Sequence, residues 1–180
     1  MSNVAIIGSG SWGIALAIHL AKKGNKVKVW SFKEEEANVI NSEKKCIFLP
    51  KVTLPDGIQC FTNIEETLKD TEIILHVTPS KFVRSTLKNY KNFIKNQSVV
   101  VCSKGFEDGT LYTLSQIFDE EIPNIKIGIF SGPSHAEEVS IGIPTAMVIA
   151  SKYNDVNEKV QNLFMNEKMR VYTSNDVIRS

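Results

Sequence analysis

A glycine triplet near the N-terminus constrains the fold of this chain more than any other feature of its sequence. The apolar residues 4–7 run straight into a turn with the spacing G-x-G-x-x-G, made of Gly8, Ser9, Gly10, Ser11, Trp12 and Gly13. An apolar segment with helical periodicity then covers residues 14–21. This order predicts a buried strand, a tight turn and the N-terminal end of a helix.

Each glycine of the turn has a separate physical role. Gly8 allows a sharp turn, Gly10 allows the backbone to approach a pyrophosphate, and Gly13 allows the helix to pack closely on the strand. The unpaired amides of the first helical turn would face the phosphates, whose negative charge the helix dipole favours. The turn therefore favours a dinucleotide-binding site over an ordinary glycine-rich turn.

Apolar strands and helical segments alternate along the rest of the chain. Further strands are expected at residues 27–30, 72–77, 98–102, 126–130, 145–150 and 170–172, and helices at 65–69, from 82 onward, at 112–118 and at 156–164. Residues 41–61 are expected to be irregular, with short strands. Continuous apolar strands separated by helices are typical of a parallel sheet covered on both faces. We therefore predict an α/β fold, a Rossmann-type doubly wound, mostly parallel sheet with helices on both faces, over residues 1–180.

Composition excludes several classes of partner. The net charge of +1 argues against a nucleic-acid or membrane-surface binder, and no apolar stretch reaches the length of a membrane span. Cys46, Cys60 and Cys102 are widely spaced, and neither they nor the histidines have metal-ligand spacing, so no metal site is expected. Sparse thiols and the lack of a signal peptide favour a cytoplasmic location.

In a sheet of this kind, ligands bind beyond the carboxyl ends of the strands. Five strand ends carry notable residues, and we expect them to meet at one cleft: the glycine turn, Ser31-Phe32-Lys33, Thr78-Pro79 with Phe82, Ser103-Lys104-Gly105, and Gly132 to Ala136. Lys104 could offer its charge to a phosphate or carbonyl, or be an ordinary loop lysine. Ser134 has capping-box spacing to Glu137, so it is expected to begin a helix and could also hold an anion.

The segment after the second strand leaves the choice of dinucleotide open. The acid that usually binds the adenosine ribose is not directly at this strand end. Phe32 could lie against the adenine and Lys33 could meet a 2′-phosphate, which keeps NADP as well as NAD open. Alternatively, Lys33 and the three glutamates after it form a solvated helix end that Ser31 begins, since Ser31 and Glu34 also have capping-box spacing.

The three histidines of the chain have different expected places. His76 lies within a predicted central strand, so we expect it to point into the packing of the sheet with a hydrogen-bond partner. His19 and His135 are expected on helix surfaces.

Three blocks of sequence resemble the glycerol-3-phosphate dehydrogenase family. They are Gly8-Ser-Gly-Ser-Trp-Gly-Ile-Ala-Leu-Ala17, Val101-Cys-Ser-Lys-Gly-Phe-Glu107, and Ser131-Gly-Pro-Ser-His-Ala-Glu-Glu-Val139 followed by Gly142-Ile-Pro-Thr-Ala146. The resemblance implies reversible reduction of dihydroxyacetone phosphate to sn-glycerol 3-phosphate with NAD or NADP as cofactor, a step that feeds phospholipid synthesis. A homodimer of the full-length enzyme is left open.

The resemblance also implies roles for individual residues. The turn Gly8 to Gly13, Phe32, Phe82, Lys104 and Ala136 would contact the dinucleotide, with Lys33 as an addition, and Lys104, Gly132 and Ser134 would contact the substrate. An aromatic residue at the place of Phe32 resembles NAD-using members, whereas a basic residue near Lys33 resembles NADP-using ones.

The family continues beyond the point corresponding to Ser180 into a helical domain that supplies the general acid/base lysine. No catalytic residue is therefore assigned within this chain, which we expect to be the cofactor domain, a fragment or truncated product with little or no turnover. The alternatives are a stand-alone nucleotide-binding module and the cofactor domain of a hydroxyacyl-CoA or 6-phosphogluconate dehydrogenase.

Overall fold

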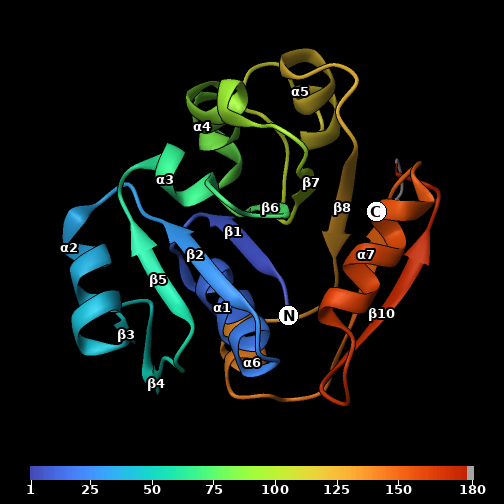
Figure 1. The fold of residues 1–180 in the computed structure, drawn as a ribbon. Coiled ribbons are helices and arrows are strands. Elements are labelled where there is room, and N and C mark those ends of the chain that lie inside the picture. The colour runs from blue at the N-terminus through green and yellow to red at the C-terminus, as the bar shows by residue number, and fades with distance from the viewer. Residues whose placement is uncertain (178–180) are drawn as a thin grey trace.

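Eight strands form one sheet in the computed structural model, which describes residues 1–177 (Figure 1). Their order across the sheet is β10-β9-β8-β7-β6-β1-β2-β5. The bounds are β1 (Asn3–Ile7), β2 (Lys26–Trp30), β5 (Ile58–Phe61), β6 (Ile73–His76), β7 (Ser98–Val101), β8 (Ile127–Ser131), β9 (Thr145–Ala150) and β10 (Met169–Ser174). A separate two-stranded sheet pairs β3 (Lys45–Cys46) with β4 (Leu49–Thr53).

Helices cover both faces of the large sheet. They are α1 (Ser11–Lys22), α2 (Glu34–Asn38), α3 (Ile64–Leu68), α4 (Val83–Tyr90), α5 (Leu114–Glu121), α6 (Ala136–Ser140) and α7 (Asn154–Phe164), with the short turns η1 (Val39–Glu43), η2 (Ser80–Phe82) and η3 (Lys91–Phe93). Side chains alternate along β1, so Val4 and Ile6 pack with α1, α6 and α7, whereas Ala5 and Ile7 pack with α3, α4 and α5. Figure 1 shows α1 beside α6 and, on the opposite side, α4 near α5. The predicted doubly wound α/β fold is confirmed.

One pair of neighbouring strands in the large sheet is antiparallel. β9 runs opposite to β8, and β10 is parallel to β9, whereas β5, β2, β1, β6, β7 and β8 all run in one direction. The carboxyl ends of these six strands therefore share one edge, and those of β9 and β10 lie at the other. The sheet is mostly parallel, as predicted.

Several predicted boundaries shift in the structure. The first helix begins at Ser11 and not at residue 14, so Trp12 and Gly13 belong to its first turn. Residues 41–61 contain short strands, as expected, and the last of them, β5, pairs with β2 as the outermost strand of the large sheet. The helix expected at 112–118 is α5, which begins at Leu114 because Thr113 and Gln116 form a reciprocal capping box.

Both capping-box predictions for serine are wrong. Lys33 holds the N-cap position of α2 without a side-chain cap hydrogen bond, and the Ser31 hydroxyl lies 2.9 Å from the Glu36 carboxylate and accepts from the Lys33 amide. His135 holds the N-cap position of α6, also without a side-chain cap hydrogen bond, and the Ser134 hydroxyl pairs with that of Thr145. Neither serine hydroxyl therefore caps the helix to which the local spacing assigns it.

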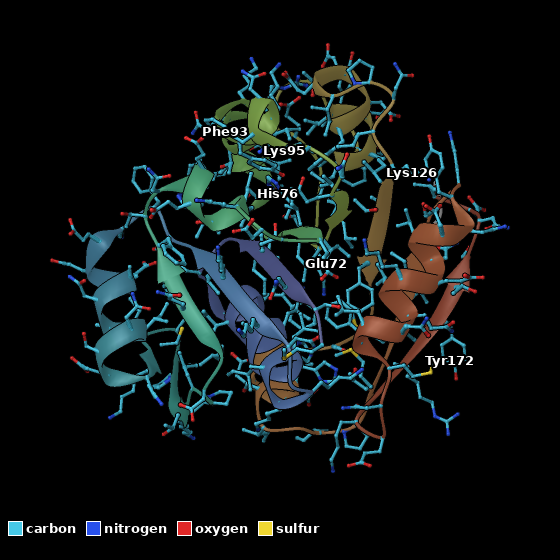
Figure 2. All side chains as sticks on the ribbon, in the orientation of Figure 1. Glu72, His76, Phe93, Lys95, Lys126 and Tyr172 are labelled. Carbon is cyan, nitrogen blue, oxygen red and sulfur yellow. The ribbon has the colours of Figure 1, made fainter. Side chains whose placement is uncertain are left out.

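His76 and His19 are both buried. The His76 ring, seen below α4 in Figure 2, lies 2.7 Å from the Tyr90 hydroxyl through Nδ1 and 2.8 Å from the Thr78 hydroxyl through Nε2. This confirms the prediction for His76. The prediction for His19 is wrong, because its Nε2 lies 2.7 Å from the carbonyl oxygen of Phe164, between α1 and α7. His135 is exposed, as predicted.

Burial of His76 predicts acid sensitivity. Burial lowers its pKa to about 3, so the folded chain keeps the ring neutral while the unfolded chain protonates it near 6.5. Folding stability from this residue is complete above pH 6.5. It falls as the pH drops, by about 1.4 kcal/mol per unit until the folded pKa is reached. Urea unfolding across this range should show a shallower pH dependence for His76→Leu than for the parent chain. His135→Gln is the control, and equal slopes for His76→Leu and the parent would contradict the prediction.

Among residues 1–177, no helix combines the length and apolar character needed to cross a membrane.

Candidate functional site

A pocket of about 940 Å³ opens at the carboxyl ends of the parallel strands. Its wall includes residues that follow β1, β2, β6 and β7, together with the start of α6. β1 lies between β2 and β6, so the chain leaves β1 at the point where the strand order reverses, which is where open α/β sheets bind ligands. The volume is that of a typical small-molecule or cofactor site.

The glycine turn forms the floor of this pocket. Gly8 has a φ of +133°, and a Cβ there would lie 2.5 Å from the Val77 carbonyl oxygen on the neighbouring segment. A Cβ on Gly13 would lie 2.2 Å from the carbonyl oxygen of Gly8. The predicted turning role of Gly8 and packing role of Gly13 are therefore confirmed. At Gly10 a Cβ would meet no atom within 4 Å, so the backbone is open toward the pocket.

The indole N–H of Trp12, a residue of the glycine turn, is a buried donor without a hydrogen-bond partner among residues 1–177. A buried donor without a partner costs about 1–3 kcal/mol. The open backbone at Gly10 and the free amides at the start of α1 fit a phosphate-containing ligand.

The far end of the pocket lies beyond β2. Phe32 and Lys33 both line it, and Phe32 is 83% exposed, so its ring is available to a planar group. Glu36 also lines the pocket, and its carboxylate accepts hydrogen bonds from the hydroxyls of Ser9 and Ser31. The same charge adds to burial in raising the pKa of Cys60 to about 12.

Lys104 lies on the opposite wall. Its Nζ is 3.3 Å from the carbonyl oxygen of Gly132 and 5.6 Å from the centre of the Trp12 ring. The side chain is exposed, so its charge is available at the mouth of the pocket. The structure therefore brings Lys104, the glycine turn and the end of β8 together.

An ion-pair cluster holds the loop that carries Lys104. Arg84 on α4 donates to both carboxylate oxygens of Glu107, at 2.6 and 2.9 Å, and to Glu120 and Glu121 on α5. The guanidinium holds the pKa of Glu107 at about 2, well below its usual range. The loop after β7 is therefore fastened to two helices, which fixes the place from which Lys104 extends.

Of the remaining predicted residues, three line the pocket and Gly132 does not. Phe82, Ser134 and Ala136 line it, and Ala136 is the first residue of α6. Gly132 does not line it, because a Cβ there would contact Met147 and the carbonyl oxygen of Ala146, so the glycine faces β9. Its contact with the site is the carbonyl oxygen that accepts from Lys104.

Sequence reasoning missed Glu36 and the α4 residues Ser85, Thr86 and Asn89, which also line the pocket. A signal for Glu36 exists in the sequence. Glu36 lies four residues before the apolar Ile40, a spacing that places both residues on one face of an α-helix and so turns Glu36 toward the protein. Nothing comparable distinguishes the α4 residues from a solvated helix face.

Other chemistry is not supported by the described residues. No group of three or more His, Cys, Asp or Glu side chains within 1–177 is arranged to hold a metal ion. Cys102 lines the pocket, but burial raises the pKa of its thiol, which keeps it neutral and unreactive.

A doubly wound sheet with a glycine turn at its switch point defines the Rossmann class of dinucleotide-binding domains. The sequence model described as "NAD-dependent glycerol-3-phosphate dehydrogenase N-terminus" matches residues 3–157 of the chain. The chain therefore belongs to the family of N-terminal domains of NAD-dependent glycerol-3-phosphate dehydrogenases.

Individual relatives agree with this family. The protein named glycerol-3-phosphate dehydrogenase [NAD(P)+] of Agathobacter rectalis is 45% identical over 180 residues, which cover 99% of this chain and 54% of that protein. The Fusobacterium nucleatum protein of the same name is 43% identical over 183 residues, with the same coverage. The chain thus spans about half the length of the curated relatives it matches.

Solved structures give the same result. The glycerol-3-phosphate dehydrogenase of Coxiella burnetii superposes with a TM-score of 0.93 at 29% identity, over 98% of this chain and 55% of that one. That of Saccharomyces cerevisiae gives a TM-score of 0.86 at 28% identity, over 98% and 57%.

Proposed function

We propose that the chain binds NAD or NADP in the pocket, as the cofactor domain for reversible reduction of dihydroxyacetone phosphate to sn-glycerol 3-phosphate. The observation that carries the proposal is the backbone at Gly10, which is open where the pocket floor meets the free amides of α1. The pyrophosphate would lie over Gly8 to Gly13, facing the free amides at the start of α1.

The rest of the dinucleotide would extend along the two walls of the pocket. Phe32 and Lys33 would contact the adenosine half, and Phe82, Lys104 and Ala136 the nicotinamide half; all five line the pocket. When bound, the nicotinamide supplies a hydride to the substrate carbonyl carbon.

The substrate would lie between Lys104 and the segment that begins α6. The Lys104 ammonium would hold the phosphate or carbonyl oxygen of the substrate, and the Ser134 hydroxyl would donate to the same molecule. Ser134 is paired with Thr145, and with the Thr145 hydroxyl as the donor of that pair the Ser134 proton is left for the substrate. The Gly132 carbonyl, which accepts from Lys104, would set the direction of the ammonium.

Reduction of a ketone also needs a proton for the developing alkoxide. By resemblance to the family, we assign this proton to a lysine outside residues 1–180. We therefore propose that these residues form the cofactor domain, which binds dinucleotide with little turnover.

Calorimetric titration with NADH and NADPH, followed by an assay with dihydroxyacetone phosphate, tests this proposal. We expect saturable binding of dinucleotide and a turnover at least about 100-fold below that of the Agathobacter rectalis relative, the range that a general acid contributes. Failure to bind either dinucleotide would contradict the cofactor site. Turnover equal to that of the relative would contradict the assignment of the proton donor.

We also propose a cytoplasmic location. The support is that Cys46, Cys60 and Cys102 are free thiols, as suits a reducing compartment. Fractionation of the source cells with an antibody to the chain tests it, and recovery outside the cytoplasmic fraction would contradict it.

A further inference from the structure

Glu36 lies where the glycine turn, the end of β2 and helix α2 meet. Its Oε2 accepts a hydrogen bond of 2.6 Å from the Ser9 hydroxyl and one of 2.9 Å from the Ser31 hydroxyl. The side chain is partly buried and forms part of the pocket wall. The carboxylate is therefore held at a fixed place beside the glycine turn.

This carboxylate has capacity to accept more hydrogen bonds. An ionised carboxylate offers about four acceptor positions, and the second oxygen, Oε1, has no hydrogen-bond partner among residues 1–177. The two contacts already made both come from hydroxyl groups. A ribose presents the same donors, as the neighbouring 2′ and 3′ hydroxyls of one ring.

The acid that binds the adenosine ribose in dinucleotide-binding folds follows the second strand. In this chain Ser31, Phe32 and Lys33 follow β2 directly, and none of them is an acid. Glu36 reaches the same place from the first turn of α2, as its hydrogen bond to Ser31 shows. We propose that Glu36 receives the adenosine ribose and makes the site select a dinucleotide with a free 2′-hydroxyl over one with a 2′-phosphate. This inference rests on the proposed cofactor site.

Lys33 provides the opposing influence, because it lines the pocket with a charge that suits a 2′-phosphate. Its side chain is exposed and takes part in no ion pair among the described residues, so water and salt screen its charge. Glu36 is partly buried and fixed by two hydrogen bonds, so its repulsion of a phosphate is screened less. The balance therefore favours NAD.

Dissociation constants for NADH and NADPH, measured calorimetrically in one buffer, test the proposal with Glu36→Gln. Glutamine keeps the size of the side chain and one acceptor oxygen for the two serines, but it removes the charge. The parent chain should bind NADH more tightly. In Glu36→Gln the ratio of the NADPH constant to the NADH constant should fall at least about tenfold, mainly through tighter binding of NADPH.

Glu35→Gln is the matched control. Glu35 is the exposed neighbour of Glu36 on α2 and does not line the pocket, so the variant makes the same change in net charge away from the site. Its ratio should stay within about twofold of the parent value, since exposed charges contribute little. Thermal unfolding checks that Glu36→Gln is folded, and loss of the fold in this near-isosteric variant would mean that Glu36 is structural and would overturn the proposal.

The two constants separate a specificity role from a structural one. An equal weakening of NADH and NADPH in Glu36→Gln would mean that Glu36 merely holds the turn, and would overturn the proposal. A parent chain that prefers NADPH, or an unchanged ratio, would also overturn it. A parent chain that binds neither dinucleotide would contradict the proposed function itself.

Discussion

We expect Gly13→Ala to destabilise the fold, whereas Gly10→Ala leaves stability nearly unchanged and abolishes most of the dinucleotide binding. A Cβ on Gly13 would lie 2.2 Å from the Gly8 carbonyl oxygen, a backbone atom that cannot move without shifting the turn. Overpacking costs about 1–3 kcal/mol and occasionally more, and a clash with backbone belongs at the upper end of that range. The higher helix propensity of alanine, worth about 1 kcal/mol, does not offset it.

Gly10 provides the contrast because a Cβ there would meet no protein atom within 4 Å. Its φ of −70° suits alanine, and the change at a helix N-cap costs less than about 1 kcal/mol. The added methyl group would instead occupy the space proposed for the pyrophosphate. We expect the NADH dissociation constant to rise at least about tenfold, equivalent to 1.4 kcal/mol.

Urea unfolding and calorimetric titration of the two variants measure both effects. An unchanged free energy of unfolding in Gly13→Ala would contradict the packing role of that glycine. NADH binding equal to that of the parent in a folded Gly10→Ala would mean that the pyrophosphate does not lie against this turn.

The second large effect is expected at Lys104. In a version of the chain extended to the length of its relatives, Lys104→Ala should weaken productive substrate binding by about 2–4 kcal/mol, because a charge-assisted contact to phosphate or carbonyl is lost. The ammonium already lies at the pocket mouth between Gly132 and Trp12. Steady-state kinetics with dihydroxyacetone phosphate would show the loss in kcat/KM.

Lys152→Ala is the control for Lys104→Ala. Lys152 is also an exposed lysine just after a strand, but that strand is β9, whose carboxyl end lies at the opposite edge of the sheet, and Lys152 does not line the pocket. Its removal should leave kcat/KM within about twofold of the parent value. If Lys104→Ala behaved in the same way, Lys104 would be an ordinary loop lysine.

The central part of the fold could be predicted because its sequence signals are local and agree with one another. Each apolar run predicts one strand, as residues 4–7 before Gly8 do, and each segment with helical periodicity predicts one helix. Parallel strands then bring their carboxyl ends to one edge of the sheet. The direction of β9 could not be predicted in this way. A helix lies between β8 and β9, as in a parallel crossover, yet β9 turns back along β8.

The hydrogen-bond partners of polar side chains were harder to predict, because some of these partners lie far away in the sequence. Ser134 has the spacing of a helix cap but pairs with Thr145, which lies on β9. His19 resembles a surface residue of α1, but α7 packs over it and supplies the Phe164 carbonyl. Neither partner can be identified from local spacing.

The position of Glu36 in the candidate site could not be predicted from local spacing either. The residues directly after the strand lack an acid, which weakened the case for NAD alone and left NADP open. In the structure Glu36 reaches back from α2 to Ser9 and Ser31, so a residue on a helix occupies the place of one on a strand end.

The most direct test of the dinucleotide site is energy transfer from tryptophan to NADH. Trp12 and Trp30 both line the pocket and are the two tryptophans of the chain. Addition of NADH should quench their emission saturably and produce nicotinamide emission on tryptophan excitation, and excess NAD should reverse both changes. Quenching that rises linearly without saturation would contradict the proposal that this pocket holds the cofactor. Quenching that persists in the presence of excess NAD would contradict it as well.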